Sequence, residues 1–215
     1  MLTANDPHAA GRVLTAGRSP EESALTLVLI HGRGASAAGM LPLVDALGVP
    51  DVSAIAPQAA GATWYPHSFL EPLEANQPYL DSALRRVESV VVGLLDRGVP
   101  SDRIAILGFS QGACLTSEFV ARHPRRYGAV MALTGGLIGP AGTPRDHAGR
   151  LDGVPVLLAS GDPDPHVPFE RVLETERVLA GMGATVEVRR YPGRPHTISQ
   201  DEIDACRKML QAITG

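Results

Sequence analysis

The sequence predicts a protein of the α/β class, in which helices cover both faces of a doubly wound, mostly parallel sheet. Three observations indicate this class. Short aliphatic runs recur along the 215 residues, helical patterns alternate with them, and several runs lack the apolar–polar alternation of a half-exposed strand. Strands that are apolar on both faces belong inside a parallel sheet, so we expect ligands to bind beyond the carboxyl ends of the strands.

Each element has its own signal. The aliphatic runs predict strands at 12–16, 25–30, 52–56, 103–107, 129–134, 154–159 and 185–191. The helical patterns lie at 79–97, 111–123, 168–182 and 199–213. The last helix opens with a capping box formed by Ser199 and Glu202, and Pro168 suits the first turn of the helix that it precedes. Residues 57–78 and 135–152 are long irregular loops, which in compact domains usually carry function.

Length and composition fit one globular domain, residues 1–215, with 44% hydrophobic and 20% charged residues. The formal net charge is −4 and no basic cluster is present, so we expect no nucleic-acid partner. The N-terminus lacks signal-peptide features, and the stretch 25–30 is too short to cross a bilayer. A cytoplasmic protein without an integral membrane segment is therefore expected, and a homodimer is compatible with the sequence. Cys114 and Cys206 are expected to be buried free thiols.

The stretch ILGFSQGAC places Ser110 between Gly108 and Gly112. In a chain with 23 glycines this pattern is a weak motif by itself. Its context is more specific, because the serine lies on the sharp turn between the strand at 103–107 and the helix at 111–123. Glycines on either side remove Cβ atoms that would clash in such a turn, and the helix N-terminus favours a developing negative charge. Ser110 is therefore the candidate nucleophile.

A serine hydroxyl needs a general base, and the base needs an acid to orient it. His196 follows the strand at 185–191, and two aspartates, Asp162 and Asp164, follow the strand at 154–159. Both loops come at the carboxyl ends of strands, where they are expected to meet Ser110. Spacing alone does not choose between the aspartates. Flanking prolines favour Asp164 as the acid, and Asp162 is expected to cap the turn through its own backbone.

An oxyanion hole requires two N–H donors near the nucleophile. We assign one to the backbone of Gln111, the residue after Ser110, and the other to Arg33 in the glycine-flanked turn HGRG. The alternative is that HGRG is only a tight turn. His31 is expected to orient this turn, and the Arg33 side chain either places a cation at the pocket mouth or points to water.

The loop at 57–78 supplies candidate substrate contacts in Trp64, Tyr65 and Phe69, although core packing explains Trp64 equally well. His67 and His166 are candidate contacts at the pocket rim. The other histidines, His8, His123 and His147, are expected at the surface. Metal ligation and a cofactor are not expected, because the sequence has no HExxH motif, no paired cysteines and no carboxylate cluster beyond the two aspartates.

The segments LIHGRG, GFSQG, GDPDPHVP and GRPH occur in this order on these elements. Together they resemble the carboxylesterase family of α/β-hydrolases that includes acyl-protein thioesterases and lysophospholipase-like esterases. The resemblance runs from 25–30 to the final helix and implies an α/β-hydrolase fold with little or no separate cap. Its G-x-x-D-x-x-V-P pattern, laid on residues 161–168, marks Asp164 as the triad acid. HGRGAS and ATWYPHSF depart from the usual thioesterase pattern.

These observations predict a serine carboxylesterase whose substrates are small molecules, namely short- to medium-chain carboxylic esters. The reaction is expected to proceed through an acyl-enzyme intermediate and without a cofactor. Ser110 attacks, His196 acts as base and then acid, and Asp164 holds His196. An acyl-protein thioesterase or a lysophospholipase is the alternative enzyme. A non-catalytic binding module on the same fold is the alternative of another class.

Overall fold

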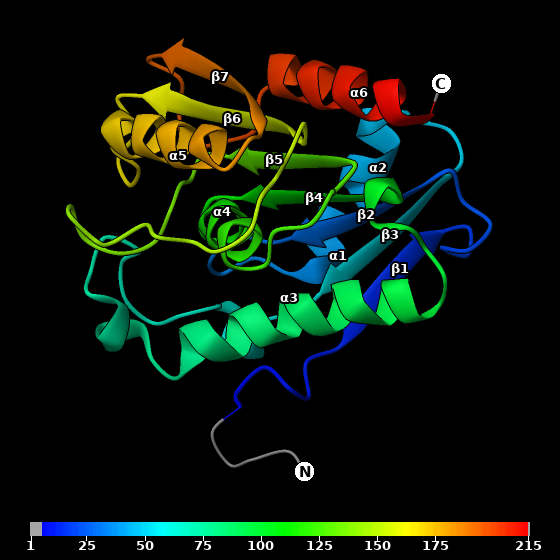
Figure 1. Cartoon of the computed structure of the whole chain (residues 1–215), viewed down its shortest axis with the longest axis horizontal. Coiled ribbons are helices and arrows are strands. Elements are labelled where there is room, and N and C mark those ends of the chain that lie inside the picture. The colour runs from blue at the N-terminus through cyan, green and yellow to red at the C-terminus, as the bar shows by residue number, and fades with distance from the viewer. Residues whose placement is uncertain (1–5, 215) are drawn as a thin grey trace.

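The computed structural model describes residues 6–214, so residues 1–5 and 215 of the expected single domain lie outside the described residues. One sheet runs through the molecule in the strand order β1-β3-β2-β4-β5-β6-β7 (Figure 1). Its strands are β1 (Val13–Gly17), β2 (Leu25–Ile30), β3 (Val52–Pro57), β4 (Ile104–Phe109), β5 (Ala129–Leu133), β6 (Pro155–Asp162) and β7 (Thr185–Pro192). β1 pairs antiparallel with β3, and the other neighbouring pairs are parallel.

Helices cover both faces of this sheet. The helices are α1 (Ala37–Met40), α2 (Pro42–Leu47), α3 (Tyr79–Asp96), α4 (Gln111–Arg122), α5 (Phe169–Gly181) and α6 (Gln200–Thr214). Short 3-10 turns form at η1 (Ala60–Ala62), η2 (Leu73–Asn76) and η3 (Ser101–Arg103). Residues of α3, α4 and α5 share one apolar cluster with the sheet, and residues of α1, α2 and α6 share the other. The predicted doubly wound α/β class is therefore confirmed.

The strand sequences explain this layering. In β2, Val28 and Ile30 pack into the cluster under α3, α4 and α5, whereas Leu27 and Leu29 pack into the opposite cluster. Successive strand residues point to opposite faces, so a strand that is covered on both sides has no solvent-exposed position. The edge strands β1 and β7 keep the alternation of exposed and covered side chains.

All seven predicted strands and all four predicted helices are present, with ends shifted by no more than a few residues. The sequence reading missed α1 and α2, which have only 4 and 6 residues. Elements this short carry little helical periodicity, and these two form because Ala37, Met40 and Leu47 are buried against the sheet. The capping box is confirmed, since the Ser199 N–H donates to Glu202 Oε2 at 2.7 Å. Both cysteines are buried free thiols, as predicted.

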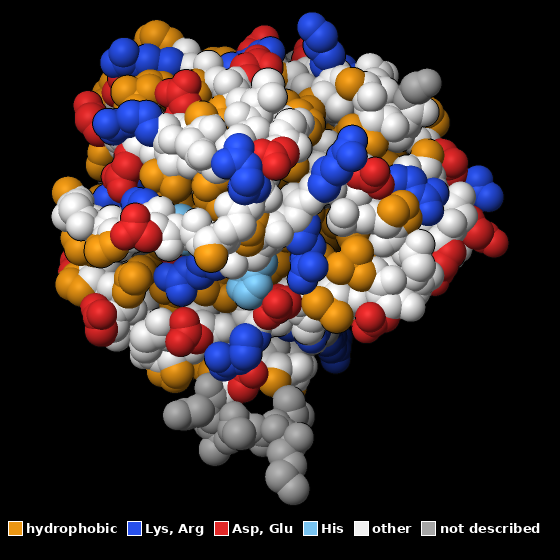
Figure 2. Space-filling view, viewed as in Figure 1, with side chains coloured by type: hydrophobic (Ala, Val, Ile, Leu, Met, Phe, Trp, Pro, Cys, Tyr) orange, Lys and Arg blue, Asp and Glu red, His pale blue; other side chains and the backbone are white. Residues whose placement is uncertain are grey.

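The parallel strands all end at the same edge of the sheet, on the left of Figure 1. The turn after β4 and the loops after β6 and β7 therefore lie close together. On the face drawn in Figure 2, basic and acidic side chains are interspersed with scattered hydrophobic ones. Among the helices of residues 6–214, none is long and apolar enough to cross a membrane.

Candidate active site

Ser110 lies on a strained turn between β4 and α4, with φ 55° and ψ −120°. Its backbone N–H donates to Leu133 O at 3.0 Å, which fixes the turn to the end of β5. A Cβ at Gly108 would lie 2.2 Å from Gly112 O, and one at Gly112 would lie 2.1 Å from Ile30 O. Only glycine fits at both positions, so the glycines allow the backbone to pack closely around Ser110.

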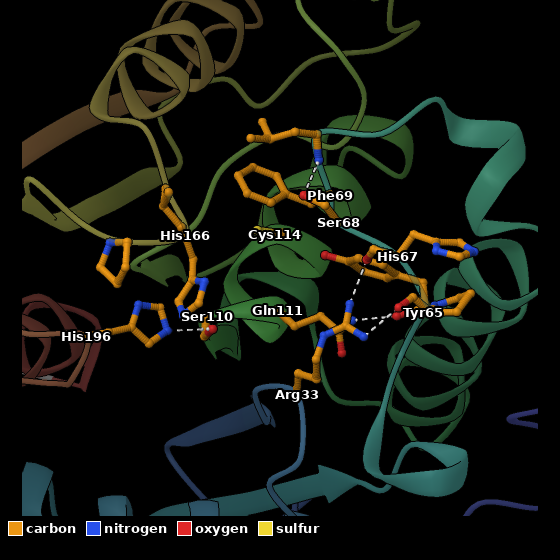
Figure 3. A pocket seen from close by; sticks show the side chains of 14 residues that line it. Arg33, Tyr65, His67, Ser68, Phe69, Ser110, Gln111, Cys114, His166 and His196 are labelled. Atoms are coloured by element: carbon orange, nitrogen blue, oxygen red, sulfur yellow. Dashed lines mark hydrogen bonds between the residues drawn. The ribbon is translucent and has the colours of Figure 1, made fainter.

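The loop after β7 brings His196 to this serine. Ser110 Oγ lies 2.8 Å from His196 Nε2, as the dashed line in Figure 3 marks. On the other side of the ring, His196 Nδ1 lies 2.9 Å from Asp164 Oδ2. An ionised carboxylate only accepts hydrogen bonds, so Nδ1 carries the proton and Nε2 is free to accept from the serine hydroxyl. The imidazole is 21% exposed, whereas the Asp164 side chain is fully buried.

Asp164 is held by three donors. Besides the imidazole, the backbone N–H groups of His166 and Val167 donate to Oδ1 at 2.9 and 3.0 Å. Burial by itself raises the pKa of Asp164, but the hydrogen bonds from His166, His196 and Val167 outweigh it and lower the pKa below its usual value. Asp164 therefore stays ionised opposite the imidazole.

The second aspartate of this loop is used differently. Asp162 forms an ion pair with Arg190. The prediction that Asp162 caps the turn is wrong, because Asp164 caps it through Oδ1 while contacting His196 through Oδ2. One carboxylate serves both purposes since its two oxygens face opposite sides of the turn.

The turn that contains Arg33 passes directly beside the nucleophile. A Cβ on Gly32 would lie 3.3 Å from Ser110 Cβ. The backbone N–H groups of Arg33 and Gln111 donate to no acceptor among residues 6–214. Both are thus available to an anionic oxygen bound next to Ser110. The Gln111 side chain is not available, because it accepts from the Trp64 N–H at 2.9 Å and donates to Tyr65 O at 2.8 Å.

Ser110 opens onto a pocket of about 670 Å³ (Figure 3). Of the predicted substrate contacts, Tyr65, His67, Phe69 and His166 line this pocket. Trp64 does not line it: the side chain is fully buried and Nε1 donates to His31 O at 2.8 Å. The prediction of a pocket contact is wrong for Trp64, and the core-packing alternative is correct.

Of the two expectations for the Arg33 side chain, a cation at the pocket is the one that the structure supports, because Arg33 lines the pocket. Its guanidinium donates to Pro66 O at 2.7 Å and to His67 O at 2.6 Å (Figure 3). It therefore ties the turn beside Ser110 to the neighbouring segment of the pocket wall at Pro66 and His67.

His31 orients the same turn, as the sequence predicted. Its Nδ1–H donates to Gly32 O at 2.8 Å, and its Nε2 accepts from the Ala59 N–H at 3.1 Å. Burial lowers the pKa of His31, and the neutral ring is the form that can donate at one nitrogen and accept at the other. The neutral imidazole thus joins the turn to the loop that carries Tyr65.

The prediction that His8 is exposed is wrong. His8 is fully buried, accepts from the Ala60 N–H at 3.0 Å and donates to Trp64 O at 2.9 Å. Burial lowers its pKa as well. His123 and His147 are half-buried rather than exposed. No local pattern marks His8, because its partners lie more than 50 residues away in the chain.

The sequence analysis did not predict six of the residues that line the pocket: Pro66, Ser68, Leu70, Cys114, Pro165 and Val167. Cys114 had a usable signal, since a residue four positions after Ser110 lies on the same face of α4. Burial raises the pKa of the Cys114 thiol to about 11, so it acts as an apolar wall. Within residues 6–214 no three His, Cys, Asp or Glu side chains are grouped so that they could hold a metal ion.

A serine at positive φ between a strand and a helix, hydrogen-bonded to a histidine from a later strand, is the nucleophile arrangement of one class of enzymes. With this sheet, it defines a serine hydrolase of the α/β-hydrolase fold. The chain belongs to the phospholipase/carboxylesterase family, because the sequence profile of that family matches residues 12–214.

Individual relatives agree with the family. A phospholipase/carboxylesterase structure from Dyadobacter fermentans is 42% identical, with a TM-score of 0.90 over 94% of this chain and 97% of that chain. An acyl-protein thioesterase 1 of Cryptococcus neoformans is 26% identical over 89% of this chain and 94% of its own. A probable SOBER1-like carboxylesterase of Arabidopsis thaliana is 28% identical over 65% of this chain, and the match spans only 55% of that protein.

Proposed function

We propose that this protein is a serine carboxylesterase for short- to medium-chain carboxylic esters. One observation carries the proposal: the hydrogen-bonded series Ser110–His196–Asp164 opens onto a pocket, beside two backbone N–H groups that donate to no acceptor within residues 6–214. Such an arrangement can activate a hydroxyl and stabilise the oxyanion that its attack creates.

Each residue then has a defined step. Ser110 Oγ attacks the ester carbonyl carbon while His196 Nε2 takes the hydroxyl proton, and the N–H groups of Arg33 and Gln111 stabilise the oxyanion. When the tetrahedral intermediate collapses, His196 gives the proton to the departing alcohol and an acyl-enzyme remains. Water, deprotonated by His196, attacks the acyl carbonyl and releases the acid and the free serine. Asp164 stays ionised throughout and stabilises the imidazolium, in line with its lowered pKa.

The wall of the pocket supports the choice of substrate. Its side chains Tyr65, Phe69, Leu70, Cys114 and Val167 are largely apolar and suit an acyl chain. A volume of about 670 Å³ lies within the ordinary size of small-molecule sites. Thioester hydrolysis is the second candidate, because a relative that aligns along most of its length is an acyl-protein thioesterase.

Rates on p-nitrophenyl esters and acyl thioesters of increasing chain length test this proposal. We expect kcat/KM to be highest for short- to medium-chain esters and lower for the matched thioesters. The reverse preference would favour the thioesterase, and wild-type protein that neither hydrolyses esters nor reacts with a fluorophosphonate would favour a binding module.

Ser110→Ala is the matched variant for this panel. We expect it to fold and to lose about 10⁴- to 10⁶-fold in kcat, because the residues of a triad act as a unit. A folded variant that keeps more than about a tenth of the activity would remove Ser110 from the mechanism.

A cytoplasmic location, a single domain over residues 1–215, a homodimer and the lack of a nucleic-acid partner stay predictions from the sequence. The dimer is tested most directly, by the mass of the purified protein in solution.

A further inference from the structure

A buried guanidinium lies behind the loop that carries His196. Arg194 comes two residues before the histidine, and its side chain is only 8% exposed. Its Nη1 donates to Thr197 O and to the carboxylate of Glu202, and its Nη2 donates to Thr134 Oγ1 at 2.8 Å. The loop is therefore bound to two other parts of the fold through one side chain.

One of these anchors lies next to the nucleophile. Thr134 directly follows β5, and its N–H donates to Ala159 O of β6 at 2.6 Å. The residue before it, Leu133, accepts the hydrogen bond from the Ser110 N–H at 3.0 Å. Arg194 therefore fixes the loop of the histidine to the same strand end that fixes the serine.

The other anchor is the start of α6. The Glu202 side chain is fully buried and also accepts from the Ser199 N–H at 2.7 Å. A buried carboxylate needs a cation or several donors, since an unpaired buried charge is strongly destabilising. Arg194 meets this need, and the pair holds the residues that follow His196 as well as those that precede it.

Apart from the contacts of Arg194 and of the triad, the loop is held by a small number of backbone hydrogen bonds. The Gly193 N–H donates to Asp162 O, at the end of β6, at 3.0 Å. Within the loop, the Arg194 N–H makes a long hydrogen bond of 3.3 Å to Tyr191 O, and Pro195 has no N–H to donate. Gly193 has φ +67°. The His196 ring also packs against Phe109 and His166, with ring centroids 5.3 and 4.9 Å apart. The Arg194 side chain adds the buried anchors that join the loop to Thr134 and Glu202.

We propose that Arg194, paired with Glu202, is a positioning residue that holds His196 within hydrogen-bond reach of Ser110. Arg194 lies behind the histidine and contacts no reacting atom, so it acts only through the place of the imidazole. This inference rests on the proposed function, in which His196 is the general base.

Arg194→Met is the first test, because it keeps an unbranched side chain and removes every donor. We expect kcat to fall about 10²-fold, since a displacement of about 1 Å at a catalytic group has an effect of this size. Arg194 is not among the described residues that line the pocket, so KM should stay within about threefold. A merely structural role would not lower kcat while KM stays the same, so this combination would indicate a positioning role.

Arg189→Met is the matched control. Arg189 also joins β7 to α6, through Asp201 at 2.9 Å, and it pairs with Glu187 at 2.7 Å. Within residues 6–214, the hydrogen bonds and ion pairs of Arg189 go to Glu187 and Asp201 and do not reach residues 193–198, so its loss should leave kcat unchanged. If both variants lose stability but only Arg194→Met loses kcat, the proposal is supported; equal kcat for Arg194→Met and wild type would overturn it.

Thr134→Val keeps the test decisive if Arg194→Met fails to fold. It removes one hydroxyl acceptor and leaves the ion pair with Glu202 intact. We expect a severalfold lower kcat and a shifted resonance for the His196 Nδ1–H proton, which reports the contact with Asp164. An unchanged kcat and an unchanged resonance in a folded variant would overturn the proposal.

The failure of this inference is distinguishable from failure of the proposed function. If the wild type hydrolyses esters and Ser110→Ala does not, the mechanism stands whatever Arg194 does. A wild type that neither hydrolyses esters nor reacts with a fluorophosphonate would overturn both.

Discussion

At the scale of single residues, the two aspartates of the loop after β6 differ only in what surrounds them. The Asp164 side chain is fully buried and accepts three hydrogen bonds, one of them from His196, whereas the Asp162 side chain is 20% exposed and pairs with Arg190. Both side chains are carboxylates, so their chemistry does not distinguish them. Burial and the hydrogen-bond donors around it make the Asp164 carboxylate suitable to orient the His196 imidazole.

We therefore expect Asp164→Asn and Asp162→Asn to differ sharply. Asn at 164 keeps the shape but favours the wrong imidazole tautomer, and should cost on the order of 10⁴ in kcat. Asn at 162 removes an ion pair of the loop and should cost about tenfold or less, through a small change in loop geometry. Measuring kcat for both folded variants decides the matter. The opposite order would transfer the acid to Asp162, and two mild effects would remove this loop from the mechanism.

At the scale of elements, the nucleophile turn depends on how closely α4 approaches its neighbours. Helix α4 is buried along most of its length, and Gly112 in its first turn lies against the end of β2. The same helix carries Cys114 into the pocket wall, so a shift of its N-terminus would change both the nucleophile and the pocket.

Gly112→Ala should therefore lower both Tm and kcat, because its Cβ would lie 2.1 Å from Ile30 O and the backbone would have to move. Gly93→Ala in α3 is the control, since no atom lies within 4 Å of its added Cβ. There we expect a gain of about 0.5–1 kcal/mol in unfolding free energy and unchanged kcat. Thermal unfolding and kcat of both variants test this. Wild-type activity in Gly112→Ala would mean that the turn tolerates a Cβ.

At the scale of the whole molecule, the site depends on contacts between distant segments. Ser110, His196 and Asp164 come from loops after β4, β7 and β6, and the parallel order of the sheet brings them together. The pocket wall at Tyr65 is held in a similar way by His8 near the start of the described chain and by His31 after β2.

These two buried histidines predict a pH dependence of stability. Their folded pKa values lie below the ordinary value of 6.5, so between the two values the unfolded state binds more protons. Their contribution to stability is complete above the ordinary value and is lost as the pH falls through it toward the folded pKa. We expect the unfolding free energy to decrease from neutral pH toward pH ~5, with a slope of at most about 1.4 kcal/mol per pH unit for each histidine.

Urea unfolding at several pH values, with His8→Gln beside the wild type, measures this effect. The variant should show a shallower slope, because it lacks one group that titrates on unfolding. Equal slopes in wild type and His8→Gln would contradict the assignment.

The sequence by itself determined the features whose causes are local. The apolar runs determined the strands, the strand–turn–helix context determined the place of Ser110, and the loops after later strands determined those of His196 and the aspartates. Each depends on side-chain periodicity or on backbone sterics within about ten residues, and such information is present in the chain before it folds.

Only the tertiary structure decided which polar groups meet. It placed Trp64 and His8 in the core, joined the Arg33 guanidinium to Pro66 and His67 and set Arg194 against Glu202. It also formed α1 and α2, whose few residues are held by burial against the sheet. The physical reason is the same in each case: a buried polar or apolar group is stabilised by partners from distant segments, and local sequence does not specify those partners.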